Sequence, residues 1–118
     1  MKIPKTLEEC YIELDQSEGI DQWLTETEDS AIALYHSTTG RWIRNNWGLW
    51  TDGKLKQWFI SNEITEPDDM SGIILRSFYR YKKGLDINLE EQFKHTIDFY
   101  IEQKIIKNNY ENSKKNRI

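Results

Sequence analysis

Apolar residues recur along most of this chain at steps of three and four, the spacing of one face of an α-helix. Several of these stripes begin beside Thr6, Thr65 or Asn88, each followed three positions later by an acidic residue. Such capping boxes satisfy backbone amides that the first helical turn leaves unpaired. The pattern predicts helices near residues 6–16, 28–47, 54–62, 68–82 and 88–107, a short helical turn near 20–24, and little or no strand.

These stripes predict an all-α fold, a compact single-domain bundle of about five or six helices over residues 1–107. The tail from 108 to 118 is rich in Asn and Lys with almost nothing to bury, so we predict that it is disordered. The core is expected to contain large apolar residues from all the main stripes: Leu14, Ile32, Ile43, Trp47, Trp58, Phe59, Ile74, Phe78, Phe93 and Ile97.

The composition narrows the class of protein. The chain has 118 residues, the length of one domain, and a net charge of −4. That charge argues against extended nucleic-acid binding, which needs a broad basic surface. Cys10 is the only cysteine, so a reducing compartment is the simpler interpretation. Neither a signal peptide nor an apolar run long enough for a membrane span is evident, so we expect a cytoplasmic protein without membrane contact.

The segment 36–50 concentrates three of the five tryptophans, two arginines and one of the two histidines. If it is helical, Ile43 and Trp47 lie on one face, as core residues do. Gly40 is a poor helix former, so it either breaks the helix or lets another backbone come close. The segment therefore contains both a core stripe and a candidate recognition surface.

The candidate recognition surface combines polar residues from two predicted helices. Arginine forks fit carboxylates and phosphates, although the arginines could equally pair with acids of neighbouring helices. Because the apolar faces of helices 28–47 and 68–82 must be buried, we expect the two helices to pack together and Asp69 to pair with an arginine. The predicted site contains these residues: His36, Arg41, Arg44, Asn45, Asp68, Asp69, Arg76 and Arg80.

Familiar catalytic signatures are missing: there is no HExxH, CxxC pair, Gly-rich phosphate loop or nucleophile elbow. We therefore expect no metal and no cofactor, and a solvated His95. The favoured function is a small binding module that captures a protein partner or a small anionic ligand. The alternative is an enzyme acting on a phosphorylated or nucleotide-like substrate, with His36 or Asp69 as acid–base.

The stretches GRWIRNNWGLW at 40–50 and PDDMSGIILRSFYRY at 67–81 resemble motifs of a family of small bacterial proteins classed as a domain of unknown function. The resemblance extends from Ile3 to Gln92. Members often carry a histidine where this chain has Tyr79, so a residue on which chemistry could depend is replaced here. The resemblance implies no activity. It implies that certain residues recur together in the family, either because they form a shared site or because they share a folding constraint. These residues are His36, Gly40, Arg41, Arg44, Asn45, Trp47, Trp50, Pro67, Asp68, Asp69, Met70 and Ser71.

Overall fold

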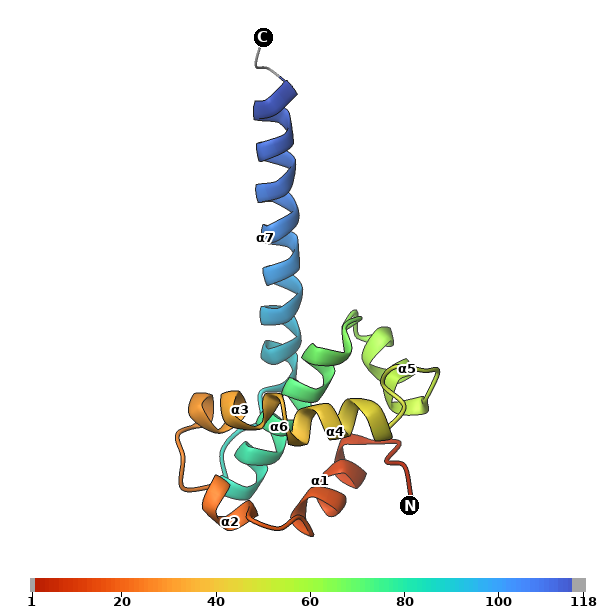
Figure 1. Ribbon diagram of the computed structural model, residues 1–118, viewed down its shortest axis with the longest axis vertical. Helices are drawn as coiled ribbons and strands as arrows, with labels where there is room; N and C mark the ends of the chain where they lie inside the picture. The colour runs from red at the N-terminus through yellow and green to blue at the C-terminus, as the bar shows by residue number, and fades with distance from the viewer. Residues whose placement is uncertain (1, 116–118) are drawn as a thin grey trace.

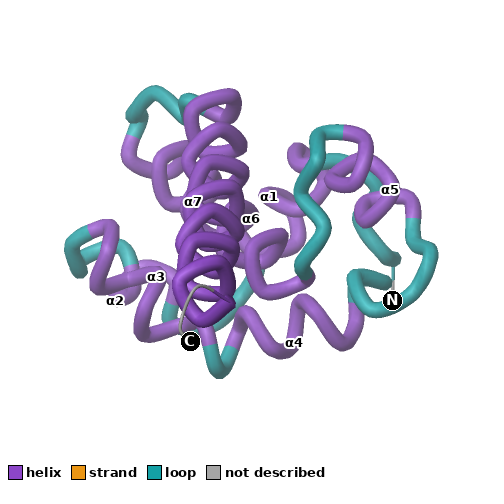
Figure 2. Tube along the Cα trace, turned by 90° about the horizontal axis from the view of Figure 1, so that it is seen from above, coloured by secondary structure: helices purple, strands orange, loops and turns teal. Residues whose placement is uncertain are grey.

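The computed structural model describes residues 2–115. This part of the chain contains seven α-helices, joined by loops, and no strand (Figures 1 and 2). The all-α prediction is confirmed, and the number of helices exceeds the five or six expected. In chain order the helices are α1 (Leu7–Asp15), α2 (Ile20–Trp23), α3 (Glu28–His36), α4 (Thr39–Asn46), α5 (Lys54–Ser61), α6 (Pro67–Lys83) and α7 (Leu89–Lys115).

Helix α6 is the centre of the fold, in contact with α1, α3, α4, α5 and α7. It begins at Pro67, which needs no amide partner in the first turn, and it ends at Gly84 in a left-handed conformation with φ of 68°. Most of its length is buried, including the small polar residues Ser71 and Ser77. The other helices of the body are therefore positioned by their contact with α6.

The single helix expected over 28–47 is divided into α3 and α4, which is a correction to the prediction. The backbone leaves the helical conformation at Thr38, with φ of −111° and ψ of −91°. Gly40 follows this break and is buried, and a Cβ there would lie 3.1 Å from the Tyr35 carbonyl oxygen and 3.1 Å from Arg44 Nη1. The glycine therefore permits the close approach that the sequence left open as one alternative.

The close contacts at Gly40 predict the sign of a substitution. Gly40→Ala should lower the free energy of unfolding by about 1–2 kcal/mol, because the overpacking outweighs the gain in helix propensity. Gly72 is the matched control, a helical glycine at which an added Cβ would meet nothing within 4 Å. Gly72→Ala should raise stability by about 0.5–1 kcal/mol in urea denaturation. Stabilisation by both substitutions would contradict the close packing at Gly40.

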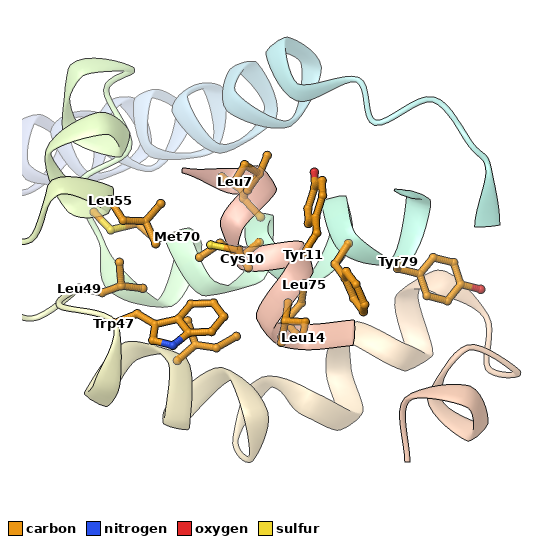
Figure 3. Packing of buried hydrophobic residues seen from close by; sticks show 14 of the residues in the cluster. Leu7, Cys10, Tyr11, Leu14, Trp47, Leu49, Leu55, Met70, Leu75 and Tyr79 are labelled. Atoms are coloured by element: carbon orange, nitrogen blue, oxygen red, sulfur yellow. The ribbon is translucent and has the colours of Figure 1, made fainter. Parts of the chain in front are cut away.

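Six of the ten residues predicted for the core are buried, and the other four are less buried than expected. Leu14, Ile43, Trp47, Phe59, Ile74 and Phe78 are buried (Figure 3 shows part of this cluster). The remaining four lie at the edge of the core and are partly buried: Ile32, Trp58, Phe93 and Ile97. Trp58 and Phe93 meet edge to face with ring centroids 5.7 Å apart. This edge stays half open because only the first turns of α7 cover the body.

Helix α7 leaves the body and extends alone (Figure 1), which contributes to overall dimensions of 61 × 32 × 24 Å. It continues to Lys115, past the end near residue 107 expected from the sequence, and contains no glycine or proline to stop it. Side chains from Asp98 to Lys115 are all exposed. Residues 116–118 of the predicted tail lie outside the described part. Within residues 2–115, no helix combines the length and apolar character that a membrane span requires.

Candidate functional site

A cleft of about 810 Å³ lies where α3, α6 and the first turns of α7 meet. Five of the eight predicted site residues line it: His36, Asp68, Asp69, Arg76 and Arg80. The expected packing of the 28–47 segment against the 68–82 helix brings them together, since α3 and α4 both contact α6. The other three predicted residues, Arg41, Arg44 and Asn45, are not among the residues that line the cleft.

Arg44 is buried, does not line the cleft, and contacts residues of two other helices. Its Nε is 3.1 Å from Asp68 Oδ1, and its Nη1 donates to Ser71 Oγ at 2.9 Å. Its Nη2 donates to the carbonyl of His36 at 3.2 Å, one of the carbonyls that a helix end leaves without an intrahelical partner. All three nitrogens are thus used within the chain, so Arg44 acts as a structural residue that joins α3, α4 and α6.

The two aspartates at the start of α6 have partners other than those predicted, since Asp69 was expected to pair with an arginine. Asp68, rather than Asp69, pairs with an arginine, and Asp69 Oδ2 accepts a hydrogen bond from Tyr100 Oη at 2.7 Å. Successive helical residues point about 100° apart, so one carboxylate reaches Arg44 and the next reaches α7. The hydrogen bond to Asp69 is the main reason that the pKa of Tyr100 is raised to about 12.

Arg76 and Arg80 form an ion-pair cluster with the first turn of α3. Glu28 accepts from Arg80 Nε at 2.7 Å and from Arg80 Nη2 at 3.0 Å. Arg76 Nη1 donates to Glu28 Oε2 at 2.7 Å and to Asp29 Oδ1 at 3.0 Å. The hydrogen bond from Arg80 is the main reason that the pKa of Glu28 is lowered.

Glu28 is the main residue of this cluster that sequence reasoning missed. Its signal was present, because acids gather at the start of the α3 segment, but acids in that position also favour a helix N-terminus and so do not by themselves indicate an ion pair. About fifty residues separate Glu28 from the two arginines along the chain, so no local sequence pattern could reveal the ion pairs. Arg80 also donates to the carbonyl of Ile87 at 2.8 Å, which ties α6 to the loop before α7.

Arg41 and Asn45 lie on the exposed outer face of α4. Asn45 Oδ1 accepts a hydrogen bond from Trp50 Nε1 at 2.9 Å. Trp42 and Trp50 on this side are 46% and 57% exposed, and within the described residues Arg41 has no ion pair. The structure therefore divides the predicted site into a cleft and a separate surface on α4.

The start of α7 adds residues to the cleft that the sequence did not single out. Glu91 and His95 line it, and His95 is exposed to solvent, as expected. Gln92 lines it too and is 9% exposed, and its Oε1 has no hydrogen-bond partner in the described structure. Among residues 2–115, no group of three or more His, Cys, Asp or Glu side chains is arranged to hold a metal ion.

The cleft is rich in carboxylates. Asp29, Asp68, Asp69 and Glu91 line it against two arginines, both already bound to acids of α3. Asp68 keeps 62% of its side chain exposed in spite of its ion pair with Arg44, and Asp29 keeps 91%. The accessible charge in this cleft is therefore mainly negative.

The fold and the cleft define a small all-α domain from which one long helix projects. The chain belongs to the family described as "Domain of unknown function (DUF6794)", which matches residues 3–82. The matched region comprises the body through most of α6, and it stops short of the limit at Gln92 expected from the resemblance. Helix α7, one wall of the cleft, lies beyond it. No curated protein and no solved structure matches the chain.

Proposed function

We propose that this chain is a small helical binding module whose cleft receives a cationic segment of a protein partner. The observation that carries the proposal is the excess of accessible carboxylate in the cleft, where both arginines are already paired. A lysine or arginine entering there gains Coulomb energy from several acids at once. A small anionic ligand, the other possibility expected from the sequence, would meet these carboxylates instead.

The apolar part of the cleft suits a long cationic side chain. Ile32 and Ile73 line it beside Gly72, where no side chain fills the space. Lysine and arginine pack their methylene stems on such surfaces while the charged head contacts polar groups. The oxygen of Gln92, which lacks a donor, is a further acceptor beside this space.

The enzyme alternative has one supporting observation, because His36 and Asp69 both line the cleft. General acid–base chemistry needs such groups within reach of one substrate. However, Asp69 already accepts the Tyr100 hydroxyl. The alternative stays a prediction, and the binding module is the function that we favour.

Neutralising the cleft acids tests the proposal. We expect a short lysine-rich peptide to bind the wild-type chain with one-to-one stoichiometry in isothermal titration calorimetry. Asp69→Asn with Glu91→Gln should weaken binding about five- to tenfold, since each partly exposed charge contributes up to about 1 kcal/mol. Both substitutions keep a hydrogen-bond acceptor, so Tyr100 retains a partner.

The control pair removes the same charge elsewhere. Glu8 and Glu18 are exposed and lie outside the cleft. Glu8→Gln with Glu18→Gln should change the affinity by less than about twofold if the effect is local. Equal weakening by both pairs would show only diffuse attraction to an acidic protein and would contradict the proposal. Tighter binding of the matching glutamate-rich peptide would favour the anionic ligand instead.

A further inference from the structure

One face of α7 connects the cleft with the free part of the helix. Gln92 and Thr96 line the cleft, and the same steps of four and three continue to Phe99, Gln103, Ile106 and Tyr110. Residues at this spacing share one face of a helix and form the seam of coiled coils. We call the four residues Phe99, Gln103, Ile106 and Tyr110 the α7 seam. Its three apolar members are 51%, 53% and 63% exposed, respectively.

The charges of α7 are separated along its length. Residues 89–102 contain four acids and one lysine, a net charge of −3, and residues 103–115 contain four lysines and one acid, a net charge of +3. Two such helices side by side in parallel would place like charges together. An antiparallel pair places each acidic half beside a basic half, and opposite charges between helices favour that orientation.

We propose that the α7 seam pairs antiparallel with the α7 seam of a second copy of this chain, and that Lys114 of each copy enters the cleft of the other. In this register Phe99 faces Tyr110 of the second copy, and Gln103 faces its Ile106. The same register places Lys114 opposite His95, on the wall of the cleft. The inference rests on the proposed function, because it names the cationic group that the cleft receives.

A second copy of the chain is the partner that we favour, because the α7 seam is complementary to itself when two copies are antiparallel. A twofold axis through the middle of the seam repeats each apolar contact and each acid–lysine contact, as closed dimers do. Gln103 inside the seam is a polar residue of the kind that fixes register at a cost in stability. The contact involves a single helix from each copy, so we expect a weak dimer with a Kd on the order of 10 µM.

The first experiment measures association of the full chain by sedimentation over a range of concentrations. We expect a monomer–dimer equilibrium that Phe99→Ser with Ile106→Ser weakens by at least about tenfold. The matched control is Ile101→Ser with Ile105→Ser, which removes two equally exposed apolar side chains, 52% and 54%, from another face of the same helix. The control should leave the Kd within about twofold. A chain that stays monomeric at every concentration, or a control that weakens the dimer as much, would overturn the proposal.

The second experiment tests orientation by cysteine cross-linking. In the antiparallel register two copies of Gln103 lie near each other, whereas two copies of Ser113 lie about 26 Å apart along the axis. Gln103→Cys should therefore form a disulfide between copies under mild oxidation, and Ser113→Cys should not. Native Cys10 is buried, and burial raises the pKa of its thiol, so it stays unreactive. Cross-linking at Ser113 would indicate a parallel pair and would overturn the proposal.

The third experiment separates this inference from the proposed function. Lys114→Glu should weaken the dimer at least about fivefold, and so should Asp69→Asn with Glu91→Gln. An unchanged dimer in these variants would overturn the placement of Lys114 in the cleft. The Phe99→Ser with Ile106→Ser variant should still bind the lysine-rich peptide. Peptide binding without any dimer in the wild-type chain would overturn self-pairing alone, and a dimer without peptide binding would overturn the proposed function.

Discussion

Truncation of Trp47 to alanine is expected to lower the free energy of unfolding by about 3–5 kcal/mol, the range for large aromatic side chains removed from a core. Trp47 is 1% exposed and lies among the buried residues that include Leu49 (Figure 3). The cost has two parts, the lost transfer of the indole out of water and the cavity that remains. Urea denaturation followed by circular dichroism measures the change, because that signal does not depend on the tryptophan removed.

Trp50→Ala is the matched control for Trp47. It removes the same indole from a site that is 57% exposed, where the ring makes one hydrogen bond to Asn45. We expect a loss of about 0.5–1 kcal/mol, the net value of one such hydrogen bond. Similar unfolding midpoints for the two variants would show that Trp47 does not lie in the core.

Replacement of Arg44 by alanine is the second large effect, with an expected loss of about 3 kcal/mol in the free energy of unfolding. The substitution removes two hydrogen bonds and one ion pair of a charged group and leaves a hole between α4 and α6. The expected loss lies at the low end for a broken buried ion pair, because water can reach the exposed Asp68 carboxylate that remains. Chemical denaturation of the purified variant measures the loss.

Two further variants separate charge from geometry at this position. Arg41→Ala removes an exposed arginine of the same helix and should change stability by less than about 0.5 kcal/mol. Arg44→Lys keeps the charge but loses the planar fork, so it should recover only part of the loss. Full recovery by lysine would contradict the structural function of the three guanidinium contacts.

Most of the helices could be predicted because their signals are local. The box at Thr6 forms in half: the Thr6 hydroxyl accepts the amide of Glu9 at 3.2 Å, whereas Glu9 Oε2 accepts the amide of Lys5, rather than that of Thr6, at 3.0 Å. The box at Thr65 does not form, since α6 has Glu66 at its N-cap and no side-chain cap there. The α6 stripe nevertheless indicated the helix correctly, because burial of an apolar face contributes more to a helix in a protein than one cap does.

The break between α3 and α4 could not be predicted from local signals. The segment 28–47 has a continuous helical period, and the residue with its lowest helix propensity, Gly40, lies after the break. The break is coupled to contacts between distant residues, in which Arg44 binds the last carbonyl of α3 and both Asp68 and Ser71 near the start of α6. The sequence alone favoured neither of the two explanations for Gly40.

The amino-acid sequence by itself determined the all-α class, the position of most helices and six residues of the core, because capping and apolar period act within a few turns of the chain. It also identified five residues of the cleft, since two polar clusters beside apolar stripes had to meet. Only the tertiary structure decided which acid pairs with which arginine. Those pairs depend on the rotation of each helix about its axis, which is set by packing across the whole body. The same packing ends after the first turns of α7, so the α7 seam is left uncovered.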